Sequence, residues 1–489
     1  MSFAGKMRLV LLLSPLLLVG CASSPEGDSY SLPFAGFSTV ETRTQQATGK
    51  LAVWVQSQEQ ADHVNNRVRA LVHRKTISAD TAVQVALLNN KGLQAAYADV
   101  GMGAAEAWQQ TMFENPKVGI GTFGIGAPEL GAFRAIEGVI VANILALMTR
   151  DRRIDIADTR FRQAQLTALL ATLELAAETR AAWINAVSAF ETVTYLKQAN
   201  VAADAASELA QELGETGAFG KSGQARQHVF YAELAGQLAQ ARLAATLAKE
   251  ELTRRMGLWG GNVDYYVPDA LPGVPGRLKN KPAIERDALT NRVDLQIAKL
   301  ELEAIAKSYG LTEATRYLTD FEIIAGVEVE REIEDDERKT VTTPQIELEF
   351  VIPIFDTGQA RMRKAEMAYM RAANMLAEKA VNIRSEARSA YTNYRSSQDI
   401  ALHYKRSVLP LRTTLEEESL LTYNGMITST FELLADIRAK NNSLLLSVDA
   451  KKAFWIADAN LSAAIYGGGA ASGGSAPAAN VAEAGSAGH

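Results

Sequence analysis

The sequence predicts a mainly α-helical protein with four β-strands, in which one unit of helices and strands occurs twice. The nine residues "ALLNNKGLQ" at Ala86–Gln94 return 202 residues later as "ALTNRVDLQ" at Ala288–Gln296, with five identities. Long stretches without a helix breaker predict long packed helices. Four stretches of about ten residues read as strands, and the last two alternate apolar with polar side chains. The repeated motif therefore marks the entry to two equivalent halves.

The composition fits packed helices and gives no sign of nucleic-acid binding. The 489 residues are 47% hydrophobic and only 7% aromatic, and the formal net charge is -6. A mildly acidic chain without a basic patch lacks the electrostatic footprint of a nucleic-acid binder. We expect no nucleic-acid partner.

Motifs for catalysis or metal binding are weak. "GIGTFG" at Gly119–Gly124 matches a dinucleotide-binding glycine pattern, but a proline-containing loop follows it where a helix is required. The five histidines show no metal-ligand spacing, and we find no nucleophile motif. We expect no metal, no cofactor and no enzymatic activity.

The N-terminus reads as a bacterial secretion signal. Lys6 and Arg8 precede a short apolar core, and the segment ends in "LVGC", which resembles a lipobox with Cys21 as the acylated residue. Cys21 is the only cysteine, so a disulfide within the chain is excluded. We expect a signal peptide at 1–20, a lipidated N-terminal arm at 21–77 without a clear pattern, and a mature net charge of -8. In enteric bacteria, Asp directly after the acylated Cys favours retention in the inner membrane. Because Ala22 occupies this position, the lipobox resemblance implies a lipoprotein of the outer membrane.

The first structural repeat is expected at 78–270, and a Pro-rich linker follows at 271–282. Within the hairpin region 117–148, the second strand is apolar on both faces and fits a helix equally well. The elements expected in this repeat are a helix at Ser78–Met112, strands at Val118–Gly126 and Val139–Met148, a long helix at Asp155–Leu213, a turn at 214–221 and a return helix ending near Met256.

The second repeat is expected at 283–466 with the same order of elements, and a disordered tail at 467–489 ends the chain. Its hairpin, 320–354, contains the charged loop "EIEDDERK". The expected elements are a helix at Ala283–Leu318, strands at Phe321–Arg331 and Gln345–Ile354, a long helix at Ala360–Tyr423, a turn at 424–428 and a return helix at Ser429–Tyr466.

The long helix of the second repeat carries the seam of a coiled coil. Its apolar positions step by three and four residues, and at about 1.5 Å per residue such a helix exceeds the size of a compact domain. The seam residues are Ala373, Leu376, Ala380, Ile383, Ala387, Ala390 and Tyr394.

Strands of about ten residues suit tilted β-structure in a bilayer, and lipid tolerates no open sheet edge. Four strands cannot close a barrel alone, since the smallest known membrane barrels have about eight, so we expect the chain to associate. In the second hairpin Ile323, Ala325, Val327 and Val329 alternate with acidic residues, and only the apolar set can face hydrocarbon. The carboxylates predicted to line a lumen are Glu322, Glu328, Glu330, Glu347 and Glu349.

The stretches "PIFDTGQARMRKAEMAY" and "YNGMITSTFELLADI", together with the repeated entry motif, resemble the TolC-type outer-membrane efflux proteins, specifically their lipid-anchored branch. The resemblance covers Ser78–Tyr466. It implies long coiled-coil helical hairpins that form an α-barrel, and four strands per chain that contribute to a 12-stranded β-barrel in a homotrimer. It also implies a passive exit duct that meets a periplasmic adaptor and an inner-membrane pump, in efflux or in type I secretion.

The resemblance also implies roles for the two helical turns. Many members carry acidic residues near the second turn that constrict the tunnel; the aligned positions here are Phe431 and Leu434, with Glu432 and Asp436 nearby. The residues expected at the periplasmic tip, facing an adaptor, are Gly217, Gly220, Tyr423, Gly425, Leu433 and Leu434.

Two other classes of protein stay open at this point. A lipid-anchored periplasmic coiled-coil adaptor would use the alternating segments in a soluble β-domain. An enzyme would need a catalytic site that none of the motifs above supplies.

Overall fold

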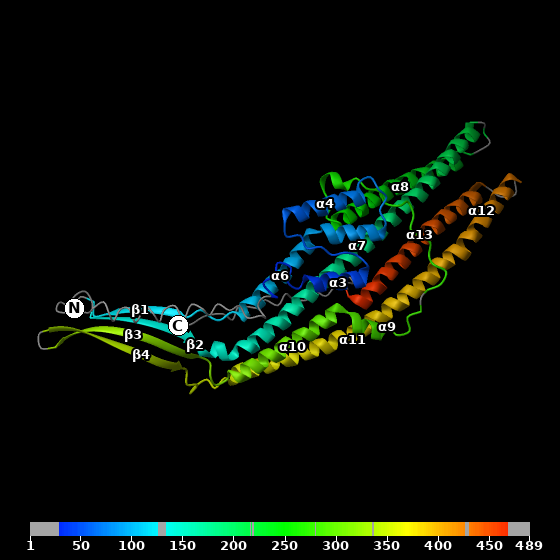
Figure 1. Ribbon diagram of the computed structural model, residues 1–489. Coiled ribbons are helices and arrows are strands. Elements are labelled where there is room, and N and C mark those ends of the chain that lie inside the picture. The colour runs from blue at the N-terminus through cyan, green and yellow to red at the C-terminus, as the bar shows by residue number, and fades with distance from the viewer. Residues whose placement is uncertain are drawn as a thin grey trace. The chain divides into compact units, whose positions relative to one another are not determined.

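The computed structural model describes residues 29–125, 134–215, 217, 220–278, 280–334, 337–425 and 430–467. The chain divides into two compact units. Figure 1 colours the chain by residue number from the N-terminus to the C-terminus. The first unit contains the described parts of Met1–Gln46, Gly92–Leu169 and Val293–Asn382, and the second contains those of Ala47–Lys91, Leu170–Arg292 and Ile383–His489. The predicted class, mainly helical with four strands, is confirmed.

The first unit combines a four-stranded sheet with helices. The strands are antiparallel in the order β1-β2-β3-β4 (Figure 1). Its elements are α3 (Phe37–Thr48), α6 (Lys91–Thr111), β1 (Lys117–Phe123), β2 (Ala135–Asn143), α10 (Val293–Ala314), β3 (Phe321–Glu334), β4 (Glu337–Phe350), and the first parts of α7 (Ile144–Glu215) and α11 (Gln359–His403).

Aromatic side chains hold the N-terminal helix of the first unit in place. The ring of Phe37 lies edge-on to that of Tyr97, with 4.9 Å between centroids, and both residues are buried. Tyr30 packs edge-on against Phe161, and its hydroxyl donates to the Asp158 carboxylate over 3.0 Å. Edge-to-face pairs of this kind add to the stabilisation that comes from burial alone.

The second unit is helical. Its elements are α4 (Gln58–Val72), α5 (Ala79–Asn89), α8 (Lys221–Arg255), a short 3-10 helix (Gly260–Val263), α9 (Ile284–Asn291), a π-helix (Tyr404–Val408), α12 (Leu409–Asn424), α13 (Thr430–Tyr466) and the later parts of α7 and α11. Helix α4 of this unit and helix α3 of the first unit both lie in the N-terminal arm, where no helix was predicted.

The repeated motif is a helix break. The helix expected at Ser78–Met112 ends at Asn89 and restarts at Lys91, because Asn90 adopts ψ 121°. The helix expected at Ala283–Leu318 breaks 202 residues later, where Arg292 adopts ψ 120°. Ser78 does cap the first helix, accepting the backbone N–H of Thr81.

In the first copy the break is tied to the end of α8. The Asn89 side-chain amide donates to the carbonyls of Met256 and Gly257, and that of Asn90 donates to the carbonyl of Arg255 over 3.0 Å. These bonds satisfy carbonyls that the helix end leaves without intrahelical partners.

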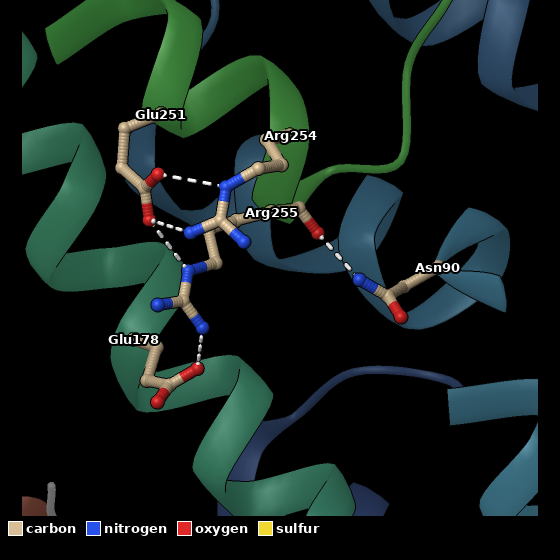
Figure 2. Close-up of polar contacts among 5 residues, drawn as sticks. All are labelled: Asn90, Glu178, Glu251, Arg254 and Arg255. Atoms are coloured by element: carbon tan, nitrogen blue, oxygen red, sulfur yellow. Dashed lines mark hydrogen bonds and ion pairs between the residues drawn. The ribbon is translucent and has the colours of Figure 1, made fainter. Parts of the chain in front are cut away.

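Charged side chains surround the same helix end (Figure 2). The Glu251 carboxylate accepts two bonds from Arg254, of 2.8 and 2.6 Å, and one of 2.8 Å from Arg255, which also pairs with Glu178 on α7. The bonds from Arg254 are the main cause that lowers the pKa of Glu251. The cluster therefore joins α7 to α8 beside the Asn90 contact.

The Pro-rich linker binds to the helices of the second unit. The Leu271 N–H donates to the Glu191 carboxylate on α7 over 2.9 Å, and Lys451 on α13 pairs with the same carboxylate. Trp455 donates to the Pro272 carbonyl over 2.9 Å, and Gln398 donates to the Pro275 carbonyl over 2.6 Å. The linker is therefore a strap across α7, α11 and α13.

The predicted coiled-coil seam is confirmed by burial. All seven seam positions are buried or half-buried, and Ile383 and Ala387 are only 1% and 0% exposed. The long helix expected at Ala360–Tyr423, however, is interrupted by the π-helix. Pro410 lies two residues after it, and its missing N–H and ring clash prevent a regular α-helical turn there.

The structure corrects the predicted first hairpin. The strand expected at Val139–Met148 ends at Asn143, because the Asn143 side-chain oxygen accepts the Ala146 N–H over 2.8 Å and starts α7. Residues 144–148 are therefore helical, which is the alternative that their uniform apolarity left open.

The strands of the second hairpin extend further toward their turn than predicted. The charged stretch expected as a loop belongs to β3 and β4, apart from 335–336, which lie outside the described residues. In the register the backbone of Glu332 stands opposite that of Lys339, so the strand pairing continues into this stretch. At its other end β4 stops at Phe350, four residues before the predicted end at Ile354.

Candidate functional site

The register of β3 and β4 places all five predicted lumen glutamates on one face of the sheet. Glu322 stands opposite Glu349, Ile324 opposite Glu347, and Glu328 opposite Thr343, so these positions share a face. On β2, Glu137 is opposite Glu328 and belongs to the same face. We call these six glutamates the acidic face: Glu137, Glu322, Glu328, Glu330, Glu347 and Glu349.

Basic residues neutralise part of the acidic face. Lys117 pairs with Glu322 at 3.4 Å, and Arg134 pairs with Glu330 at 2.8 Å. Within the described part of the chain, Glu328, Glu347 and Glu349 have no basic partner, so their charges are not compensated. The sequence reasoning missed Glu137, Lys117 and Arg134, because the pairing of β2 with β3 could not be read from either strand alone.

The opposite face of the sheet is apolar and open to its surroundings. Ile120 on β1 is 79% exposed and Ile346 on β4 is 81% exposed. Val118, Ile140, Val327 and Leu348 lie on the same face and are also exposed. One face of the sheet therefore suits hydrocarbon and the other suits water.

The turn of the first helical hairpin contains Gly217 and Gly220. Gly217 has φ +76°, a left-handed conformation that favours glycine. Gly220 precedes α8 in an extended conformation as its N-cap.

The backbone of the second turn differs from that of the first. Gly425 has φ -75° and ψ 0°, so it continues the helical conformation and requires no glycine. Leu433 is buried, with 9% of its surface exposed, and Tyr423 is half-buried. Neither side chain is openly displayed to a partner in this chain. The side chains of Phe431 and Leu434 lie outside the described residues.

Polar bonds join the two helices next to the second turn. The Ser419 hydroxyl on α12 donates to Asp436 on α13, and Lys440 on α13 pairs with Glu416 on α12. Glu432 is exposed at the start of α13. Asp436 is therefore committed to a contact within the hairpin, which the sequence pattern did not reveal.

The remaining motifs form no further centre in the described residues. No group of three or more His, Cys, Asp or Glu side chains there is placed to hold a metal. His228 is exposed and bonds to the Ser207 hydroxyl at 2.6 Å. None of the described helices combines the length and apolarity needed to cross a membrane. Cys21 and the signal sequence lie outside the described residues.

Comparison with known proteins identifies the fold. No protein-family model matches the sequence, and no curated protein matches it. Solved structures do match: the chain has the fold of bacterial outer-membrane channels, which confirms the predicted resemblance at the level of fold.

Three of these structures show the extent of the likeness. The transmembrane channel CusC is 15% identical with a TM-score of 0.66, and the match covers 80% of this chain and 92% of that one. The Campylobacter jejuni outer-membrane channel CmeC is 17% identical with a TM-score of 0.62, covering 81% and 87%. The Vibrio cholerae outer-membrane protein VceC is 14% identical with a TM-score of 0.64, covering 80% and 96%.

Proposed function

We propose that this protein is the outer-membrane channel of a tripartite efflux or type I secretion system, a passive duct from the periplasm to the exterior. The observation that carries this proposal is the sheet, whose one face is apolar and exposed while the other is acidic. The fold shared with outer-membrane channels supports it. It also favours a channel over the alternative, a periplasmic adaptor.

The sheet further supports a homotrimer. β1 and β4 are its edge strands, and an exposed apolar sheet with open edges is incompatible with lipid. Three copies joined edge to edge would supply twelve strands, enough for a closed barrel. The helical hairpins would continue the duct as an α-barrel in the periplasm.

For the anchor, we propose acylation at Cys21 after removal of 1–20, on the strength of the lipobox resemblance. The folded barrel would contribute most of the membrane-buried area, so the lipid would assist targeting and would not be required for assembly. The proposed organisation keeps the two repeats, 78–270 and 283–466, on either side of the linker 271–282, and the tail 467–489 beyond them.

A detergent gel tests both the channel and its anchor. We expect the parent protein and Cys21→Ser to migrate as trimers without heating and as monomers after boiling, because a closed barrel resists unfolding. Only the parent should incorporate labelled fatty acid. Protein that is monomeric and stays in solution without detergent, in either sample, would contradict the channel and favour the periplasmic adaptor.

We propose that the two helical turns meet a periplasmic adaptor that links the channel to an inner-membrane pump. The turn residues Gly217, Gly220, Tyr423, Gly425, Leu433 and Leu434 define this end of the molecule, and Phe431, Glu432 and Asp436 would lie at its constriction. Since Leu433 is buried, we propose that exposed side chains near the turn make the contact with the adaptor. Leu420 and Leu421 on α12 are 50% and 63% exposed.

Replacing Leu421 by Glu tests this contact. We expect efflux in cells to be abolished while the trimer persists on gels, because a carboxylate in an apolar interface is costly to desolvate. Leu411→Glu is the matched control, since Leu411 is 65% exposed on the same helix but remote from the turn, and it should retain efflux. Normal efflux in Leu421→Glu would remove this side chain from the interface.

A further inference from the structure

The end of the sheet that joins the helices carries a dense set of exposed apolar side chains. The register puts Lys117 opposite Val141, Asn143 opposite Glu322, and Phe321 opposite Phe350, so all four connections to helices leave the sheet at the same end (Figure 1). We call the segments 112–117, 144–153, 313–320 and 350–364 the junction. Its exposed apolar residues are Met112, Phe113, Leu147, Met148, Tyr317, Phe350, Val351, Ile352, Ile354 and Phe355.

These side chains are unusually open to solvent. Phe355 is 100% exposed, Ile354 is 72% exposed, and Met148 is 67% exposed. They come from all four connections, so they form a belt at this end of the sheet that does not belong to one loop alone. A belt of this kind marks an interaction surface.

The junction is also basic, although the whole chain is acidic. It contains eight basic and five acidic residues, a net charge of +3, against -6 for the full chain. The basic residues are Lys117, Arg150, Arg152, Arg153, Arg316, Arg361, Arg363 and Lys364. The positive charge therefore gathers beside the apolar belt.

Several of these cations have no carboxylate partner. Arg153 pairs with Glu114 at 3.0 Å, and Arg363 pairs with Glu366 at 2.7 Å. In contrast, among the residues that the structure describes, no carboxylate pairs with Arg152, Arg316, Arg361 or Lys364. Arg316 and Arg361 are held by backbone carbonyls, those of Thr357 and Arg316 respectively, which position the groups without neutralising them.

Cations also lie directly against the aromatic rings of the belt. The guanidinium carbon of Arg150 is 5.0 Å from the centroid of the Phe113 ring, and that of Arg316 is 4.9 Å from the Tyr317 ring. Apolar and aromatic side chains next to Arg and Lys match the boundary of a bilayer, where rings lie at the headgroup level and cations reach phosphate.

We propose that the junction binds the periplasmic leaflet of the membrane, with its apolar belt among the acyl chains and Arg152, Arg316, Arg361 and Lys364 on anionic phosphate headgroups. The inference rests on the proposed function, because it requires the sheet to cross the bilayer. It adds the depth of the protein in the membrane and the class of lipid selected.

Charge favours lipid over a second copy of the chain as the occupant. In a rotationally symmetric assembly, neighbouring junctions lie at the same height, so each would bring a net charge of +3 against another. Anionic headgroups instead neutralise these residues, and each Lys or Arg near such a surface contributes a substantial attraction.

Two tryptophan reporters in the full chain test the depth. In vesicles of phosphatidylcholine and phosphatidylglycerol, Phe355→Trp should be quenched best by lipids brominated near the headgroup. Ile346→Trp, on the apolar face and 81% exposed, should be quenched best by lipids brominated near the chain ends. The parent spectrum, with its five tryptophans, is subtracted in each case.

The pair of reporters separates this inference from the proposed function. Quenching of Ile346→Trp without quenching of Phe355→Trp would overturn the lipid-binding junction and leave the membrane sheet intact. A Phe355→Trp that is shielded from water but not quenched by lipid would mean that a second copy covers the belt. Loss of quenching at both positions would contradict the channel itself.

Lipid selectivity tests the cations. In the Phe355→Trp background, brominated phosphatidylglycerol should quench better than brominated phosphatidylcholine, and Arg361→Gln with Lys364→Gln should lower that preference about fivefold per charge. Lys197→Gln with Lys221→Gln removes the same charge from other helices and should leave the preference unchanged. Equal quenching by both lipids in the parent background would overturn the headgroup contact.

Discussion

Replacing Glu191 by alanine will destabilise the second unit by about 3 kcal/mol, the low end of what breaking a buried ion pair costs. Glu191 is 2% exposed and accepts both the Leu271 N–H and the Lys451 ammonium. Its removal leaves a buried N–H without an acceptor and a cation without a counter-ion. The Lys451 side chain is 22% exposed, so water can partly replace the lost carboxylate, which keeps the cost near the lower limit.

Glu191 stabilises more of the second unit than its ion pair with Lys451 alone, because the linker takes part in the same contacts. Lys451 also donates to the Leu271 carbonyl over 3.3 Å, so one cluster joins α7, the linker and α13. Burial and, to a lesser extent, the charge of Glu191 raise the pKa of Tyr195. In Glu191→Gln we therefore expect the pKa of Tyr195 to fall, which reports the loss of charge without loss of fold.

The shift in the urea midpoint, followed by helical circular dichroism, measures the cost. Glu366→Ala, which breaks the exposed pair with Arg363, is the matched control and should cost below about 1 kcal/mol. Glu191→Gln with Lys451→Met should recover stability relative to Glu191→Gln alone, because the amide still accepts the Leu271 N–H and no unpaired cation remains. A midpoint for Glu191→Ala as close to the parent as that of Glu366→Ala would show that the strap is not stabilising.

The helical part of the fold was predictable because its signals are long and periodic. The seam from Ala373 to Tyr394 follows directly from the spacing of apolar residues. The breaks at Asn90 and Arg292 were not predicted, since neither residue is a helix breaker and the break depends on tertiary bonds such as that from Asn90 to the end of α8. Pro410 is visible in the sequence, but the spacing of apolar residues does not show that a π-helix precedes it inside a continuing helix.

The candidate site was predictable in its faces and not in its partners. Alternation alone placed Glu322, Glu328 and Glu330 on one side of β3. The ion pairs from Lys117 and Arg134 depend on which strands are neighbours, and periodicity carries no information about that. The position of Leu433 shows the same limit, because the pattern marked it as apolar but not whether another helix covers it.

Replacing Glu328, Glu347 and Glu349 together by glutamine will remove most of the cation preference of the open channel. These carboxylates have no basic partner in the described residues, and three copies of the chain would place nine of them around one lumen. A ring of uncompensated negative charge concentrates cations and repels anions. The reversal potential in a KCl gradient across a planar bilayer measures the preference.

Two controls separate charge in the lumen from charge elsewhere. Glu59→Gln, Glu233→Gln and Glu250→Gln together remove the same charge from exposed helix positions and should leave the reversal potential unchanged. Raising the salt from about 0.1 M to 1 M shortens the Debye length from about 10 Å to about 3 Å, so the preference of the parent channel should also decline.

The ion pair of Lys117 gives a prediction of opposite sign. Lys117 is 78% exposed on its side chain and compensates Glu322, so Lys117→Gln should leave that carboxylate unbalanced and strengthen the cation preference. A general disturbance of the barrel would not shift the reversal potential of Lys117→Gln and that of the triple glutamine variant in opposite directions. Anion selectivity in the parent, or a shift of the same sign in both variants, would show that the acidic face does not line the lumen and that the sheet faces the bilayer in another orientation.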